Sequence, residues 1–232
     1  MTRQAPKTRP LPKGRVKEIL VRLELTYGRQ RWECSGKAVD VLVGTILSQN
    51  TSDANSSAGY RQLRRSFRSW NRVADAPVEE IQRCIRVSGL ANIKAPRIQR
   101  ILRQIRTDRG SINLEFLKLL PPEEALAYLM RFNGVGPKTA HCVLLFSFGM
   151  PVYPVDTHIF RIAGRLGLLP RGATAESAHE SLTRLIAPED RYAMHILLIQ
   201  HGRRTCRARS PLCQWCCLPD MCRHGRRHRK GT

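Results

Sequence analysis

Apolar residues recur at three- and four-residue intervals along most of the chain, and no segment shows the two-residue alternation of a half-buried strand. This pattern predicts an all-α protein. The first helix carries its apolar face on Val16, Ile19, Leu20 and Leu23. A more apolar and therefore buried helix follows at residues 39–47.

Further helices are predicted from their boundary residues. Asp53 is a candidate N-cap for a helix running to Phe67, and Pro77 opens another that ends near Gly89. Residues 95–109 form an amphipathic helix whose outer face is rich in arginine. Such a face suits either solvent or the phosphates of a polyanion, and the pattern leaves both open.

Two helices, Glu123–Phe132 and Pro137–Phe148, flank a short glycine-containing turn. Gly134 and Gly136 permit backbone conformations and close approaches that other residues would block, so a tight hairpin is predicted. The exposed N–H groups of Gly134, Val135 and Gly136 form a candidate phosphate site beside the start of the second helix. Plain helix-connecting architecture is the alternative.

Two polar residues near glycine and proline clusters are candidates for chemistry. Lys138 lies in the first turn of the second hairpin helix, where the helix dipole favours the neutral, nucleophilic amine. It could equally neutralise a bound phosphate. Asp156 precedes the helical pattern of residues 159–166, so it is a candidate N-cap and also a carboxylate able to stabilise positive charge and move protons.

Composition narrows the class of protein. The 232 residues, 42% hydrophobic and 25% charged, suit one large or two small globular domains, and a formal charge of +22 favours a polyanionic partner. No apolar run is long enough to span a bilayer, and from the residues at the start of the sequence we expect no secretory signal. We expect an intracellular protein with a basic N-terminal arm, although this arm leaves organelle targeting open.

Five of the eight cysteines cluster near the C-terminus, and four of these five have a 6-2-5 spacing. This spacing predicts a four-thiolate metal site, and thiolates suit either zinc or an iron–sulfur cluster. The proposed ligands are Cys206, Cys213, Cys216 and Cys222.

Other residues near the cluster complete this picture. Arg207 and Arg209 lie within the cysteine loop and are candidate phosphate contacts or a solvated basic surface. The tail from His224 to Lys230 is expected to be a flexible basic arm. The three isolated cysteines are expected to be buried thiols, and they are Cys34, Cys84 and Cys142. Cys217 has no assigned role.

Together, the Gly-Val-Gly-Pro-Lys-Thr-Ala hairpin, the Val-Asp-Thr-His segment and the cysteine spacing resemble the endonuclease III family of helix-hairpin-helix DNA glycosylases. The resemblance extends from Val16 to Cys222. It implies two helical domains with a cleft between them. One is an inserted six-helix domain of residues 37–150, and the other is a cluster domain of residues 1–36 and 151–232 with basic arms.

The resemblance also implies an activity. The family removes oxidised pyrimidines from double-stranded DNA and then cleaves the abasic site, which makes it both an N-glycosylase and a lyase. Lys138 would attack C1′ of the sugar, Asp156 would assist, and the resulting Schiff base would permit β-elimination. The family also carries a [4Fe-4S] cluster on the four spaced cysteines, and we expect a monomer of the cytoplasm or nucleoid.

An enzyme that acts on a base must flip its nucleotide out of the duplex. The family's wedge positions match Leu90 and Asn50, and His158 is expected to line the same region. Leu90 could instead be a core residue. Phe132 and Asn133 stand where the family commonly has Leu-Pro, which places the substrate preference in doubt.

Two other functions compete with this interpretation. The first is a monofunctional mismatch glycosylase of the same superfamily, but those relatives lack a lysine at the position of Lys138. The second is a non-catalytic DNA-binding module, which would bind in a salt-sensitive way and form no covalent intermediate.

Overall fold

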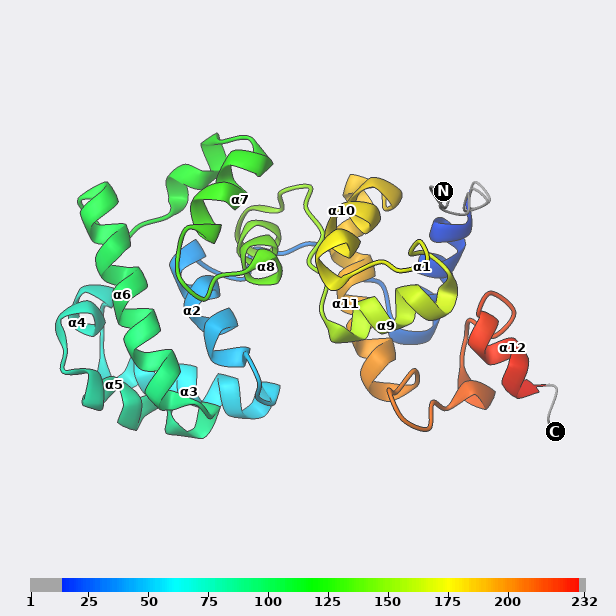
Figure 1. Cartoon of the computed structure of the whole chain (residues 1–232), viewed down its shortest axis with the longest axis horizontal. Helices are drawn as coiled ribbons and strands as arrows, with labels where there is room; N and C mark the ends of the chain where they lie inside the picture. Colours follow the sequence, from blue (N-terminus) through cyan, green and yellow to red (C-terminus); the bar gives the residue numbers. More distant parts are fainter. Residues whose placement is uncertain (1–13, 230–232) are drawn as a thin grey trace, which may run out of the picture. The chain divides into compact units, whose positions relative to one another are not determined.

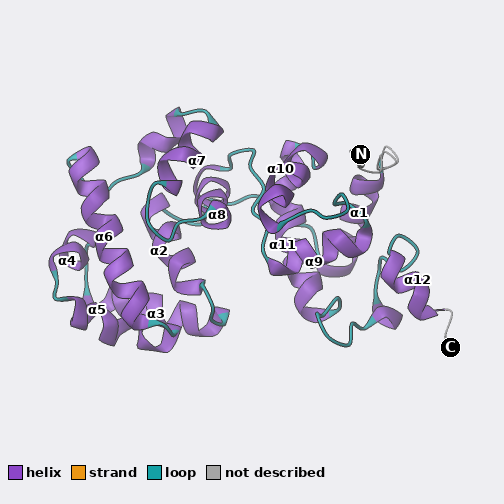
Figure 2. Cartoon of the chain, viewed as in Figure 1, coloured by secondary structure: helices purple, strands orange, loops and turns teal. Residues whose placement is uncertain are grey.

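A computed structural model describes residues 14–229, with side chains to Arg226. Over this range the chain is helical and has no strand, which confirms the predicted fold class (Figure 2). None of the helices in the described range is long and apolar enough to span a membrane. Most of the expected N-terminal arm, residues 1–13, lies outside the description.

The described chain divides into two compact units. The inserted unit comprises residues 33–150, and the terminal unit combines residues 14–32 with 151–229. The inserted unit is one continuous segment, whereas the terminal unit is built from two, and Figure 1 labels the helices of both.

The inserted unit contains seven α-helices, one more than the six expected, because the short segment after Ser69 forms its own helix. Helix α2 packs against α3 and α8, α5 packs against α3 and α6, and α7 packs against α8. The elements are α2 (Ala38–Ser48), α3 (Asp53–Ser66), α4 (Trp70–Asp75), α5 (Val78–Ile85), η1 (Arg86–Ser88), α6 (Ala91–Arg109), η2 (Glu115–Leu119), α7 (Pro122–Met130) and α8 (Pro137–Phe148).

The terminal unit joins both ends of the described chain. Helix α11 packs against α1 and α9, and α9 also contacts α10 and α12. Its core includes the predicted apolar face of the first helix, since Ile19, Leu20 and Leu23 are buried. The elements are α1 (Arg15–Tyr27), α9 (Thr157–Leu166), α10 (Ala175–Leu185), η3 (Pro188–Asp190), α11 (Arg191–Arg204), η4 (Cys213–Trp215) and α12 (Arg223–Arg229).

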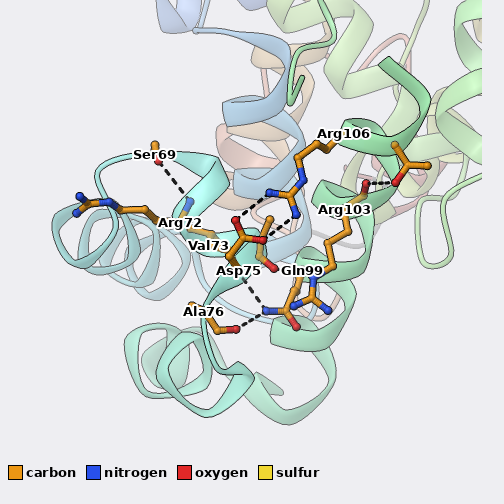
Figure 3. A network of polar contacts seen from close by, with 10 residues as sticks. Ser69, Arg72, Val73, Asp75, Ala76, Gln99, Arg103 and Arg106 are labelled. Carbon is orange, nitrogen blue, oxygen red and sulfur yellow. Dashed lines mark hydrogen bonds and ion pairs between the residues drawn. The ribbon is translucent and has the colours of Figure 1, made fainter. Parts of the chain in front are cut away.

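Helices α4 and α6 pack together, and a network of polar contacts joins them (Figure 3). The buried amide of Gln99 donates to the carbonyl of Ala76 at 2.6 Å, and the guanidinium of Arg103 donates to the carbonyl of Ala74 at 2.6 Å. These donors satisfy peptide carbonyls at the end of α4 that have no partner within the helix.

Most arginines on the outer face of α6 contact other parts of the inserted unit. Arg106 pairs with Asp75 through both of its terminal nitrogens, and Arg97 donates to Gln49. The arginines of this face are Arg97, Arg100, Arg103 and Arg106, and with Arg103 bound to α4, three of the four contact the protein itself. A third use, internal bracing, therefore adds to the two that the sequence left open.

Several predicted boundaries were wrong. Ser52, not Asp53, is the N-cap of α3, because its side chain accepts a hydrogen bond from the N–H of Asn55 at 3.2 Å. Helix α6 begins at Ala91 rather than residue 95 and includes Pro96 in its second turn. Its start is set by Leu90, which takes a left-handed conformation as the N-cap.

Two surface predictions also need correction. The tail from residue 223 to 229 forms helix α12 instead of a flexible arm, and only Lys230 falls outside the described range. Cys34 is exposed because its segment runs over the surface before α2, whereas Cys84 and Cys142 are buried as predicted.

The packing of α8 gives a test of the inserted core. Leu144 is fully buried and Leu119 is 79% exposed. We expect Leu144→Ala to lower the free energy of unfolding by about 2–5 kcal/mol through loss of burial and formation of a cavity. Leu119→Ala, measured alongside by urea unfolding, should change it by under about 0.5 kcal/mol. Equal losses would contradict this description of the core.

Candidate active site

The turn between α7 and α8 forms the predicted hairpin. Gly134 has φ +84°, a left-handed value that favours glycine, and Gly136 is the extended N-cap of α8. Val135 is buried, and its N–H donates to the carbonyl of Phe132 at 3.0 Å. The turn therefore fixes Val135 internally, while Gly134 and Gly136 lie at its exposed surface.

A side-chain network links this turn to the loop after α2. Arg97 lies so close to Gly134 that a Cβ there would sit 2.2 Å from its Nε. Arg97 donates to Gln49 Oε1 at 3.0 Å, and Gln49 Nε2 reaches the carbonyl of Gly134 and Thr139 Oγ1, each at 3.3 Å. Gln49 and Arg97 were not predicted as site residues, because the contact is between segments distant in sequence.

Lys138 is the second residue of α8 and is partly buried. Among the described residues its amine has no hydrogen-bond or ion-pair partner. Because no carboxylate of the protein pairs with this amine, it does not serve to neutralise a charge within the described structure. It is available for an external group.

Asn50 and Leu90 share an uncommon backbone conformation. Their φ values are +54° and +50°, and within the described range the only other non-glycine residue with positive φ is Ser210. Left-handed backbone costs a residue such as leucine about 1 kcal/mol or more, whereas asparagine adopts it more readily. Asn50 is exposed and Leu90 is 45% exposed, so the interpretation of Leu90 as a core residue was wrong.

Asp156 and His158 lie at the start of α9 in the terminal unit. Asp156 is the N-cap, with Oδ1 accepting from the N–H of Ile159 at 2.8 Å, and this leaves its second carboxylate oxygen available. His158 accepts through Nδ1 from Arg161 at 3.1 Å and packs against Gly202, where a Cβ would lie 2.8 Å from that nitrogen. The imidazole is thus held between α9 and α11.

The four spaced cysteines follow α11 in a loop ending at α12. Three of their sulfurs have N–H donors: Arg165 reaches Cys206 at 3.1 Å, and backbone N–H groups lie 3.3 Å from Cys216 and 3.4 Å from Cys222. Such donors stabilise thiolates and cluster sulfur. Among the described residues, no group of three or more His, Cys, Asp and Glu side chains is placed as the ligands of a metal ion.

The thiols influence one another electrostatically. Burial, followed by the nearby sulfurs of Cys206 and Cys222, raises the pKa of Cys213. Burial is also the main reason that the pKa of Cys216 rises to about 12, with Cys217 contributing. Sulfurs that disfavour each other's negative charge need a cationic centre to become thiolates together. The donor set and its N–H partners therefore fit a thiolate-bound cluster.

Two arginines of α9 brace the cysteine loop. Arg161 donates to the carbonyls of Gly202 and Cys206, and Arg165 donates to the carbonyls of residues 207 and 208 at 2.8 and 3.1 Å. Arg207 itself is exposed, as is Arg209. The roles of Arg161 and Arg165 were not predicted, although their position beside the apolar face of α9 was a usable signal.

His201 is another residue that the sequence did not reveal. It is 1% exposed, its Nδ1 lies 2.9 Å from the hydroxyl of Tyr27, and its Nε2 lies 3.7 Å from Cys216 Sγ. Burial, aided by Arg161, lowers the pKa of His201 to about 4, so the ring is neutral at pH 7. It links α1 to the cysteine loop.

Residues 43–188 match the model of the HhH-GPD superfamily base excision DNA repair proteins. The chain belongs to this superfamily. Its membership places it among the DNA glycosylases of base excision repair, and the predicted resemblance to endonuclease III is confirmed.

Individual relatives agree with this assignment. Endonuclease III of Escherichia coli strain K12 is 34% identical over 208 residues, which cover 89% of this chain and 94% of the relative. An Arabidopsis thaliana protein named as a DNA glycosylase is 40% identical over 165 residues, 71% of this chain. Those residues make up only 56% of the plant protein, so this chain spans little more than half of that relative.

Solved structures extend the comparison to the fold. A non-covalent endonuclease III–DNA complex matches with a TM-score of 0.81 and 28% identity, covering 95% of this chain and all of that one. A thermostable thymine-DNA glycosylase matches with a TM-score of 0.73 at 19% identity, covering 91% of this chain and 95% of the other. The second likeness shows a shared fold alone.

Substitutions of the two turn glycines test separately whether the turn stabilises the fold and whether it binds a DNA phosphate. Gly134→Ala should lower the free energy of unfolding by about 1–3 kcal/mol, because Ala is strained at positive φ and its Cβ displaces Arg97. Gly136→Ala, whose Cβ meets nothing within 4 Å, should leave stability unchanged. If a DNA phosphate approaches the turn, this second variant should bind duplex about tenfold more weakly.

Thermal unfolding and fluorescence anisotropy on one duplex distinguish these effects. Unchanged DNA affinity of a stable Gly136→Ala protein would mean that the turn is purely architectural. Unchanged stability of Gly134→Ala would contradict the contact with Arg97.

Proposed function

We propose that this protein is a bifunctional enzyme that excises oxidised pyrimidines from duplex DNA and cleaves the resulting abasic site. The observation that carries the proposal is the amine of Lys138, partly buried at the start of α8 and without a partner among the described residues. The endonuclease III relatives that cover most of this chain support the assignment. Double-stranded DNA is the partner, and the protein acts as a monomer.

Lys138 serves as the nucleophile in its neutral form. Its nitrogen forms a bond to C1′, and the bond between C1′ and the base breaks, with the base leaving as it gains a proton. The attacking nitrogen loses its protons, and the sugar ring opens as O4′ accepts one of them. The product is an imine between Lys138 and C1′.

The imine makes the C2′ proton acidic. Removal of that proton forms a C2′–C3′ double bond while the C3′–O bond breaks and releases the phosphate. Water then hydrolyses the imine and frees the lysine. The role proposed for Asp156 is to stabilise positive charge and accept a proton, since one of its oxygens caps α9 and the other is available.

Cys206, Cys213, Cys216 and Cys222 would hold the [4Fe-4S] cluster. When bound, the cluster supplies iron–thiolate bonds that close the loop between α11 and α12. The loop then presents Arg207 and Arg209 to DNA phosphates on a rigid support, because Arg161 and Arg165 already fix its backbone.

Borohydride trapping tests the nucleophile. Wild-type protein should form a covalent adduct with a duplex carrying one oxidised pyrimidine, and Lys138→Ala should form none while still binding. Lys118→Ala, which removes one exposed lysine charge elsewhere in the inserted unit, is the matched control and should trap normally.

If no adduct forms, the trapping is repeated on a duplex that carries an abasic site. Trapping only on that duplex would reject the oxidised-pyrimidine substrate and retain the lyase. Absence of trapping on both would reject bifunctionality and favour a monofunctional glycosylase or a binding module.

The cluster has its own prediction. Purified protein should absorb at about 400 nm, where thiolate-bound iron–sulfur clusters have charge-transfer bands. Cys213→Ala should lose this band and bound iron, whereas Cys217→Ala should keep both. A colourless protein containing stoichiometric zinc would contradict the assignment.

A further inference from the structure

The inserted unit contains a buried lysine ammonium group. Lys94, in the first turns of α6, is 1% exposed. Its Nζ donates to two backbone carbonyls, those of Leu47 and Ser88, each at 2.7 Å. Burial, assisted by the charge of Arg97, lowers the pKa of this lysine.

The two carbonyls belong to the segments that lead to the left-handed residues. Leu47 is in the last turn of α2, three residues before Asn50, and Ser88 ends η1, two residues before Leu90. One ammonium thus ties together both segments.

The Ser88 segment is also constrained from its other side. Ser88 Oγ donates to the carbonyl of Asn55 at 3.2 Å, and Gly59 of α3 lies directly against it. A Cβ at Gly59 would be 2.0 Å from that oxygen and 3.3 Å from Ser88 Cβ. The short segment before Leu90 therefore lies between α3 and Lys94.

An apolar side chain would fill this position without the cost of burying a charge. Lys94 lies on the same helical face as Ile98, Ile101 and Ile105, all of which are core residues. Its contacts instead satisfy carbonyls close to the two residues of left-handed backbone, of which Leu90 is strained. Strained backbone persists where the surroundings hold it in place.

We propose that Lys94 is a positioning residue for base flipping, which holds Asn50 and Leu90 as one rigid pair before they enter the duplex. This inference rests on the proposed function and on the wedge role that the family resemblance implies for these two residues. A wedge that is already ordered loses less conformational entropy on insertion than a mobile loop does. Lys94 itself contacts neither DNA nor the reacting sugar.

Lys94→Met tests the proposal, because methionine fills much of the same space without donating. Gln99→Met is the matched control. Gln99 lies on the same helix, is 8% exposed and donates to the carbonyls of Val73 and Ala76, away from the wedge loops. Both variants lose buried hydrogen bonds and should show a lower Tm.

Three measurements separate positioning from general destabilisation, all at a temperature where both variants are folded. The first is the single-turnover excision rate, the second is the fluorescence of 2-aminopurine placed next to the lesion, and the third is Kd for undamaged duplex. Lys94→Met should slow excision by about tenfold or more and reduce the fluorescence rise, with Kd changed by less than about twofold. Gln99→Met should change all three by less than about twofold.

A double-mutant cycle with Leu90→Ala adds a readout that a structural role would not affect. If Lys94 acts through Leu90, Lys94→Met should slow excision by less than about twofold in the Leu90→Ala background. Fully additive effects, or an equal loss of rate in Gln99→Met, would overturn the proposal.

Two further outcomes are distinguishable. If wild-type protein neither excises nor traps, the proposed function fails and the inference fails with it; an active wild type with an equally active Lys94→Met rejects the inference alone. If Lys94→Met does not fold, Gly59→Ala displaces Ser88 from the opposite side. It should reproduce the slow excision, and an unchanged rate would overturn the proposal.

Discussion

Peptide carbonyls at helix ends have no partner within the helix, and a helical protein must supply other donors wherever these ends are buried. In this protein long side chains do so. Lys94 serves the loops after α2 and before α6, Gln99 and Arg103 serve the end of α4, and Arg161 and Arg165 serve the cysteine loop. The functional loops of both units depend on these contacts.

The basic residues behind the formal charge of +22 therefore have a structural role as well as an electrostatic one. Many of the arginines are committed to carbonyls or carboxylates of their own unit, so they are not mobile phosphate contacts. They keep their charge, however, and a fixed positive charge still attracts a polyanion over about a Debye length. Basic residues thus position the loops and strengthen the electrostatic field that favours DNA.

Local patterns were sufficient for much of the fold. The hairpin, the N-cap role of Asp156 and the all-helical class follow from short-range spacing and backbone chemistry. The start of α6 was missed because Leu90 adopts a conformation that leucine rarely takes. Lys94, Gln49 and His201 were missed as site residues because each contacts a segment far away in the sequence. A lysine at a core position of α6 was the signal for the first of these.

The terminal unit pairs segments from opposite ends of the described chain. Arg15 donates to the carbonyl of Met221, 206 residues away, and Tyr27 meets His201 across 174 residues. The inserted unit contains only residues 33–150. During synthesis the inserted unit is complete before α11 emerges, whereas α1 must wait for its partner helix. The inserted unit therefore has all of its own segments before the terminal unit does, so it can fold first.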